Sequence, residues 1–474
     1  MTVHTRPWRA CLALLSTLLA ASALDAAPLE RADLAAAREL RQRALSSPLA
    51  YDLVRSLTTE VGPRFAGSPG DAAAVEWAVR NLERLGFSNV RRMDVTVPHW
   101  VRGRTEVSIV EPFPQKLVAV ALGGSIGTEE GGLAAEVIQV RDLEELQALD
   151  DSAVAGRIVF FSQRMDRTRD ASGYGRAVQV RARGPAAAAA KGAVAVVIRT
   201  IGTSNNRIAH TGATGYVDSV PPIPAVAISN PDADLLENQL ASGRPVRLSL
   251  EITARELPPA RSANVIAEIP GTDRSDEIVL LGAHLDSWDI TPGALDDAAG
   301  VAIVTAAARL IADMEPKPRR TIRVVLFANE EFGLSGARTY AAQGSQEIAR
   351  HVLAMEADLG AGPVWMIESR VAPETLPLVR QIHSVVEPLG VALGGNETSG
   401  GADIGPLRNL GVPVLSPQLD ATNYFDVHHT VNDTLDKVNP EHLSQSVAVF
   451  AVAAYLAARA DAPLPHLHPV DATR

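Results

Sequence analysis

The sequence has little of three things: cysteine, aromatic residues and positive charge. Its single cysteine, Cys11, excludes a disulfide framework and a zinc site built on cysteines. Aromatic residues make up only 4% of the chain, which argues against a stacking platform for bases. There are 44 Lys and Arg against 55 Asp and Glu, a net charge of −11. Because phosphate binding needs a cationic surface, we expect no nucleic-acid partner.

The N-terminal segment has the layout of a secretory signal peptide. Arg6 and Arg9 precede an apolar run over residues 10–23, and small residues follow it. The run is shorter than the roughly 20 residues that a membrane span needs. We therefore expect residues 1–26 to be a signal peptide. The mature protein would be exported, secreted or periplasmic, with no membrane span after cleavage.

Hydrophobic residues form 46% of the 474-residue chain, enough for a large core and about three domains. Short β-rich runs separated by Gly and Pro fill residues 104–255, with one Ala-rich helix at 185–192. From residue 262 strands and helices alternate, which predicts an α/β fold with a mixed, mostly parallel sheet between helices. The expected strands are 277–284, 321–328, 351–358, 364–369 and 411–418. The expected helices are 31–45, 71–85, 297–313, 334–344, 374–387 and 440–459.

Acids and histidines follow these strands. Ligand sites in such sheets lie beyond the carboxyl ends of the strands, so the following residues should meet at one edge. They are His284, Asp286, Asp296, Glu330, Glu331, Asp358, His428 and His429. Each alone would be an ordinary surface, capping or core residue. Together they predict a cation site, because crowded carboxylates repel one another unless cations neutralise them. Mixed histidine and carboxylate ligands suit zinc.

The number of ligands favours two zinc ions per chain. A pair of ions needs one bridging carboxylate, and Asp296 has small neighbours that let it enter the centre. In the Glu330–Glu331 pair, one carboxylate can bind metal while the other takes a proton from the metal-bound water. Asp286 would hold the ring of His284 in place.

Five motifs in this order resemble the co-catalytic di-zinc exopeptidases of metallopeptidase family 28. They are HLD (284–286), GALDD (293–297), NEEFGLSGA (329–337), MEAD (355–358) and HHTVNDT (428–434). The segments VGPR, VPHW, SIGT and HTG are similar to the carboxypeptidase Q (plasma glutamate carboxypeptidase) branch. The resemblance covers about residues 50–460.

The resemblance implies a role for each site residue. His284, Asp296 and Asp358 would hold one zinc ion, and Asp296, Glu331 and His429 the other. Glu330 would be the general base, and Tyr424 a candidate oxyanion donor. The HTG match also favours His210, in a polar loop, as a substrate contact. Asp403 is a second candidate contact. The peptide bond after Asp296 is expected to be cis.

The resemblance also implies a domain plan. Residues 28–111 and 256–461 would form the peptidase domain, with a β-rich protease-associated-like domain inserted at 112–255. The resemblance also implies a homodimer. Separately, the Pro-rich composition of residues 462–474 predicts a disordered tail.

The expected activity is zinc-dependent hydrolysis of short peptides, chiefly unblocked dipeptides. One alternative is a related di-zinc amide hydrolase, such as an aminopeptidase or deacylase. The other is a non-catalytic, receptor-like binding protein. The partner of the substrate carboxylate stays open among Arg338, Arg370 and Arg408.

Overall fold

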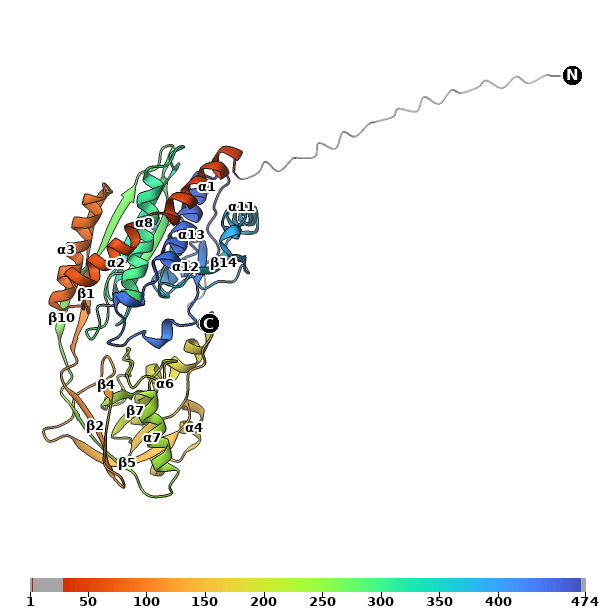
Figure 1. Cartoon of the computed structure of the whole chain (residues 1–474). Coiled ribbons are helices and arrows are strands. Elements are labelled where there is room, and N and C mark those ends of the chain that lie inside the picture. The colour runs from red at the N-terminus through yellow and green to blue at the C-terminus, as the bar shows by residue number, and fades with distance from the viewer. Residues whose placement is uncertain (1, 3–28, 470–474) are drawn as a thin grey trace.

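The computed structural model describes residue 2 and residues 29–469. Two eight-stranded sheets lie in separate lobes (Figure 1). We call them the catalytic lobe and the inserted lobe. The predicted signal peptide lies outside the described residues, apart from Thr2. Within the described part, no helix has both the length and the apolar character needed to cross a membrane.

The sheet of the catalytic lobe has the strand order β1-β10-β12-β11-β13-β16-β14-β15. Its central strands run parallel: β11 (Arg274–His284), β12 (Arg320–Phe327), β13 (His351–Glu356) and β16 (Val414–Leu419). Antiparallel pairing adds β1 (Ser88–Val101), β10 (Arg255–Ile269) and β14 (Val364–Arg370), and β15 (Ala392–Leu393) closes one edge. The predicted mixed, mostly parallel sheet is confirmed.

Helices cover both faces of this sheet, so its central strands are almost wholly buried. One face packs on α1 (Arg31–Leu45), α2 (Leu49–Glu60), α3 (Pro69–Arg84), α8 (Ala299–Ala312), α11 (Leu376–Val386) and α13 (Pro440–Arg459). The other packs on α9 (Ser335–Ala341), α10 (Ser345–Ile348) and α12 (Gly405–Asn409). In Figure 1, α1, α8 and α13 lie in one layer beside the sheet.

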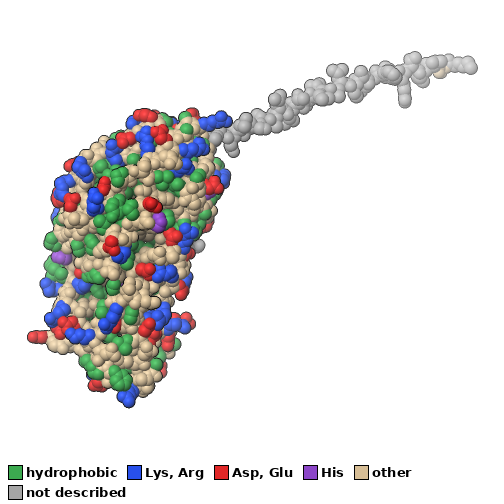
Figure 2. Space-filling view, viewed as in Figure 1, with side chains coloured by type: hydrophobic (Ala, Val, Ile, Leu, Met, Phe, Trp, Pro, Cys, Tyr) green, Lys and Arg blue, Asp and Glu red, His purple; other side chains and the backbone are tan. Residues whose placement is uncertain are grey.

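The sheet of the inserted lobe has the strand order β3-β2-β9-β5-β6-β7-β8-β4. Its strands are β2 (Thr105–Glu111), β3 (Gln115–Leu117), β4 (Ala119–Ala121), β5 (Leu133–Val140), β6 (Ile158–Phe161), β7 (Ala195–Arg199), β8 (Ala225–Ile228) and β9 (Arg247–Ile252). Its helices are α4 (Leu143–Ala148), α5 (Asp151–Val154), α6 (Ser172–Ala190) and α7 (Asn230–Leu240). On the face shown in Figure 2, basic and acidic side chains are interspersed over both lobes.

The structure corrects three details of the sequence analysis. Helix α6 spans Ser172–Ala190 rather than 185–192, because packing overrides the weak helix propensity of its glycines and Pro185. The sequence analysis did not predict helices α2 and α7, the short helices α4, α5, α10 and α12, or the long pair β1–β10. The described part of the predicted tail, 462–469, is packed: His466 and Leu467 form hydrogen bonds with His351 and Gly411.

Candidate active site

Six of the eight acids and histidines that follow the strands line a cavity of about 270 Å³ between the two lobes, and His284 and Asp286 lie behind that lining. Tyr174 and Arg181 of α6 line it from the inserted lobe. The catalytic lobe contributes Asp296, Glu330, Glu331, Asp358, Leu359, Ala402, Tyr424, Phe425, His428 and His429. A larger hollow of about 640 Å³ shares Tyr424 with this cavity, but none of the five candidate ligands lines it. The small cavity is therefore the candidate site.

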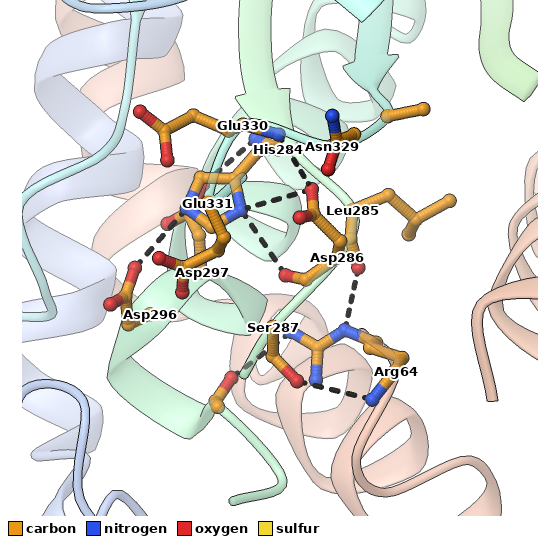
Figure 3. Close-up of polar contacts among 12 residues, drawn as sticks. Arg64, His284, Leu285, Asp286, Ser287, Asp296, Asp297, Asn329, Glu330 and Glu331 are labelled. Atoms are coloured by element: carbon orange, nitrogen blue, oxygen red, sulfur yellow. Dashed lines mark hydrogen bonds and ion pairs between the residues drawn. The ribbon is translucent and has the colours of Figure 1, made fainter. Parts of the chain in front are cut away.

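His284, at the end of β11, faces two carboxylates. Its Nε2 lies 3.1 Å from Oδ1 of Asp296 and 3.5 Å from Oδ1 of Asp358. Its Nδ1 lies 3.1 Å from the backbone oxygen of Asp286, a hydrogen bond in which the ring N–H donates (Figure 3). That bond leaves the lone pair of Nε2 free for a cation, as in metal-binding histidines.

His429 faces the other side of Asp296. Its Nε2 lies 2.9 Å from Oε2 of Glu331 and 3.2 Å from Oδ2 of Asp296. Its Nδ1 lies 3.2 Å from the backbone oxygen of Thr211, which belongs to the inserted lobe. Asp296 thus presents one oxygen to each histidine, the arrangement that a bridging carboxylate needs.

The donor set fits bound cations. Two groups of three have ligand atoms within 4.8 Å of one another: His284, Asp296 and Asp358, and Asp296, His428 and His429. Asp296 Oδ2 and Glu331 Oε1 are buried without a hydrogen-bond partner in the described part, which is costly unless a cation pairs with them. Burial, then the charge of Asp296, raises the pKa of Glu331 to about 7. Imidazole and carboxylate donors in this number suit zinc.

His428 and His429 stack with their ring centroids 3.5 Å apart. Both rings lie near Asp296. The Nε2 of His428 is 3.6 Å from Asp296 Oδ2, farther than that of His429. The Nδ1 of His428 has no partner among the described residues. These contacts favour His429, whose second nitrogen is held by Thr211, as the ligand.

Glu330 and Glu331 follow β12 at a tight turn. Asn329 has a positive φ of 59°, and its side chain donates to the backbone oxygen of Phe332 and to Ser335 Oγ. As a result the two glutamate side chains leave the backbone in different directions (Figure 3). Burial, then the charge of Asp358, raises the pKa of Glu330 well above its ordinary value.

Asp286 takes a different position from the one expected. Its carboxylate lies 3.6 Å from the Nδ1 of His284, and its own backbone oxygen holds the ring more closely. The carboxylate instead accepts a hydrogen bond of 3.0 Å from the backbone N–H of Glu330. Asp286 therefore ties the His284 strand end to the Glu330 turn.

Three residues position Asp296 and were missed by sequence reasoning. Asp433 accepts hydrogen bonds from the backbone N–H groups of Leu295 and Asp296, at 2.7 and 3.1 Å. Asp297 accepts one from the His284 N–H and one from Gly300 at the start of α8. The peptide bond between Asp296 and Asp297 is cis, as the resemblance implied.

The third, Arg64, is fully buried beneath the loop that joins β11 to Asp296. It donates to the backbone oxygen of Leu285 (Figure 3), and also to the backbone oxygens of Pro292 and Gly293. The only sequence signals for these residues were the VGPR, GALDD and HHTVNDT motifs, in which Arg64, Asp297 and Asp433 stand.

His210 does not line the cavity, contrary to the expected loop contact with substrate. It is 1% exposed, and its Nδ1 lies 2.6 Å from the backbone oxygen of His428. Asp403 is also buried, and neither of its carboxylate oxygens has a partner in the described part. It lies next to Ala402, which does line the cavity. Tyr424 lines the cavity directly.

The sequence is similar to known peptidases. The pattern of Peptidase family M28 matches residues 264–454. Carboxypeptidase Q of Mus musculus is 35% identical over 415 residues, which cover 88% of this chain and 87% of that protein. The chain belongs to peptidase family M28. It is therefore a hydrolase of the zinc-dependent metallo-exopeptidase class, as the sequence predicted.

The chain is also similar to two solved structures. The crystal structure of a Peptidase M28 precursor from Shewanella amazonensis is 50% identical, with a TM-score of 0.91, covering 93% of this chain and 99% of that one. An aminopeptidase from Aneurinibacillus sp. strain AM-1 is 24% identical, with a TM-score of 0.63 over 92% of this chain and 98% of its own. The second likeness shows the fold alone.

Proposed function

We propose that this M28 peptidase hydrolyses short, unblocked peptides, chiefly dipeptides, and that Glu330 is its general base. The observation that carries the proposal is the small cavity with two histidine–carboxylate groups that share Asp296. A cavity of about 270 Å³ is at the lower end of ligand-pocket sizes, which favours a substrate of few residues. The similarity to carboxypeptidase Q supports the same substrate class.

The donor set supports a site for two zinc ions. His284, Asp296 and Asp358 would hold one ion, and Asp296, Glu331 and His429 the other. When bound, the ions would lower the pKa of a water molecule and polarise the scissile carbonyl group.

The chain itself supplies the proton transfer. Glu330, half-buried at the cavity, accepts the proton of the attacking water and then donates it to the leaving amine. The hydrogen bond from its N–H to Asp286 fixes the backbone from which it acts. The Tyr424 hydroxyl is proposed to donate to the developing oxyanion. Asp403, buried beside Ala402, is proposed to attract the substrate's free amine.

A substrate panel on the purified, zinc-loaded protein tests this function. The panel contains an unblocked dipeptide, its N-acetyl form and an N-acetylated aryl amide of one amino acid. We expect turnover of the unblocked dipeptide, loss of activity with a chelator, and about two zinc ions per chain by elemental analysis. Cleavage of the N-acetylated aryl amide alone would favour a deacylase-type amide hydrolase. No turnover at full zinc occupancy would refute the proposal.

Export and self-association are proposed from the sequence. N-terminal sequencing of protein recovered from outside the cytoplasm is expected to begin after Ala23 or Ala26. Cytoplasmic protein that keeps Cys11 would contradict export. Light scattering on the mature protein is expected to give twice the chain mass, and a monomer would contradict the homodimer.

A further inference from the structure

Arg181 stands out among the residues that line the candidate site. It lies on α6 of the inserted lobe and is 6% exposed. Across the described residues, it is the only Arg or Lys on the lining of this cavity. None of the three arginines considered from the sequence is there: Arg338 is exposed, and Arg370 and Arg408 lie outside the cavity.

The guanidinium of Arg181 has no acidic partner within 4.0 Å in the part of the chain that the structure describes. Nη2 donates to the Tyr174 hydroxyl at 2.7 Å, and Nη1 to the backbone oxygen of Thr211 at 3.3 Å. Nε is buried without a partner. Buried charges are almost always paired, so an unpaired guanidinium facing a cavity points to an anionic ligand.

The surroundings of Arg181 fix its position. Tyr174 stands two helical turns earlier on α6, and its ring lies 5.5 Å from the guanidinium carbon. Opposite, Gly212 has a φ of 137°, and a Cβ added there would come within 2.2 Å of Nη1. The loop therefore needs glycine at 212 to leave room for the guanidinium.

We propose that Arg181 binds the C-terminal carboxylate of the substrate. This inference rests on the proposed peptidase function and names the residue that recognises the free C-terminus of its unblocked substrates. A guanidinium has five N–H donors in a planar fork, and only two of them are used here, so a carboxylate can bind in a bidentate manner. Because the cavity is small, an arginine on its wall selects peptides whose free C-terminus lies close to the cleaved bond.

The experiment compares two substrates on the zinc-loaded, full-length mature protein: an unblocked dipeptide and the same dipeptide with a C-terminal amide. We expect the wild type to prefer the free acid. In Arg181→Gln, the KM for the free acid should rise about 30-fold or more, the usual loss for a buried charge pair, while the KM for the amide stays the same. The preference for the free acid should disappear.

Two further variants keep the test decisive. Arg183→Gln changes an exposed arginine of the same helix and should keep the wild-type preference. Arg181→Lys keeps the charge but not the fork, and should give an intermediate KM for the free acid. Calorimetric binding of a free amino-acid product, compared with its amide, should follow the same order.

Equal use of acid and amide by the wild type would overturn the inference and leave the peptidase function standing. Equal loss of both substrates in Arg181→Gln and Arg181→Lys, with zinc content unchanged, would also overturn it. Failure of the wild type to cleave either substrate is the separate result that would refute the proposed function.

Discussion

The two lobes contribute to the candidate site in different ways. Every proposed metal ligand and the proposed base belong to the catalytic lobe, where they lie at the ends of β11, β12 and β13, in the turn before α8 and in the loop after β16. The inserted lobe contributes the contacts of His210 and Thr211 to the two adjacent histidines, and Arg181 on the cavity wall. The proposed chemistry therefore comes from the catalytic lobe, while the inserted lobe adds contacts that hold two histidines and the proposed carboxylate-binding arginine. Substitutions in the two lobes should give separable defects.

The largest effect is expected in the catalytic lobe, from Glu330→Gln. This variant keeps the shape of the side chain but removes the basic carboxylate. We expect kcat to fall by about two to four powers of ten, with zinc content unchanged by elemental analysis. The matched variant Glu331→Gln should lose zinc instead. If Glu330→Gln loses metal and Glu331→Gln keeps it, the roles of the two glutamates are reversed.

Asp433→Asn tests alignment within the catalytic lobe itself. The amide group can accept one of the two backbone hydrogen bonds that now hold Leu295 and Asp296, but it turns an N–H₂ toward the other. Zinc affinity should fall about 10- to 100-fold, as for other residues that orient metal ligands. Competition with a chelator measures the zinc affinity of each variant. The exposed neighbour Asp436→Asn is the control, and equal affinities in both variants would exclude the positioning role.

His210→Ala tests alignment by the inserted lobe. The change leaves the backbone oxygen of His428 without its partner and opens space beside Gly202. We expect the free energy of unfolding to fall by about 1–3 kcal/mol, with a smaller change in zinc affinity than in Asp433→Asn. Denaturant unfolding of the zinc-loaded protein measures the first quantity. Wild-type stability together with impaired turnover would restore His210 as a substrate contact.

The smallest effect on activity is expected from His351, at the end of β13 that is remote from the site. Burial lowers its pKa to about 4, and the ring contacts the Tyr340 hydroxyl and the backbone oxygen of Glu347, with Arg323 nearby. The folded pKa is below the unfolded value of 6.5. The neutral ring's contribution is therefore complete above pH 6.5 and is lost as pH falls from 6.5 toward 4.

The wild type should have a higher free energy of unfolding than His351→Gln at neutral pH. This difference should shrink between pH 6.5 and 4, by at most about 1.4 kcal/mol per pH unit. Denaturant unfolding at a series of pH values measures this difference. A difference that stays constant between pH 7 and 4 would show that His351 does not titrate there. Activity at pH 7 should be unaffected, since this end of the strand lies away from the cavity.

The parts of the fold and site that follow from local sequence patterns could be predicted, and those that depend on distant contacts could not. Strands β11, β12 and β13 each contain a short apolar run, and ligand-type residues stand at or soon after the ends of these strands, so both fold and ligands follow from local patterns. Arg64 acts on Pro292, 228 positions away, and Asp433 on Leu295, 138 positions away. No local pattern encodes such pairings. Arg181 was missed because glycines interrupt the helical pattern of its segment in the sequence. Its cavity, moreover, exists only where the lobes meet.

The pairing of β1 with β10 has a consequence for how this architecture can change. The chain enters the inserted lobe after Val101 and leaves it at Arg255, and these two residues face each other across the antiparallel pair. A short turn between them would close the first sheet as a simple hairpin. The whole segment from 102 to 254 can therefore be gained, lost or exchanged in evolution without rerouting any other strand. Such an exchange would change the wall of the cavity while leaving its zinc ligands in place.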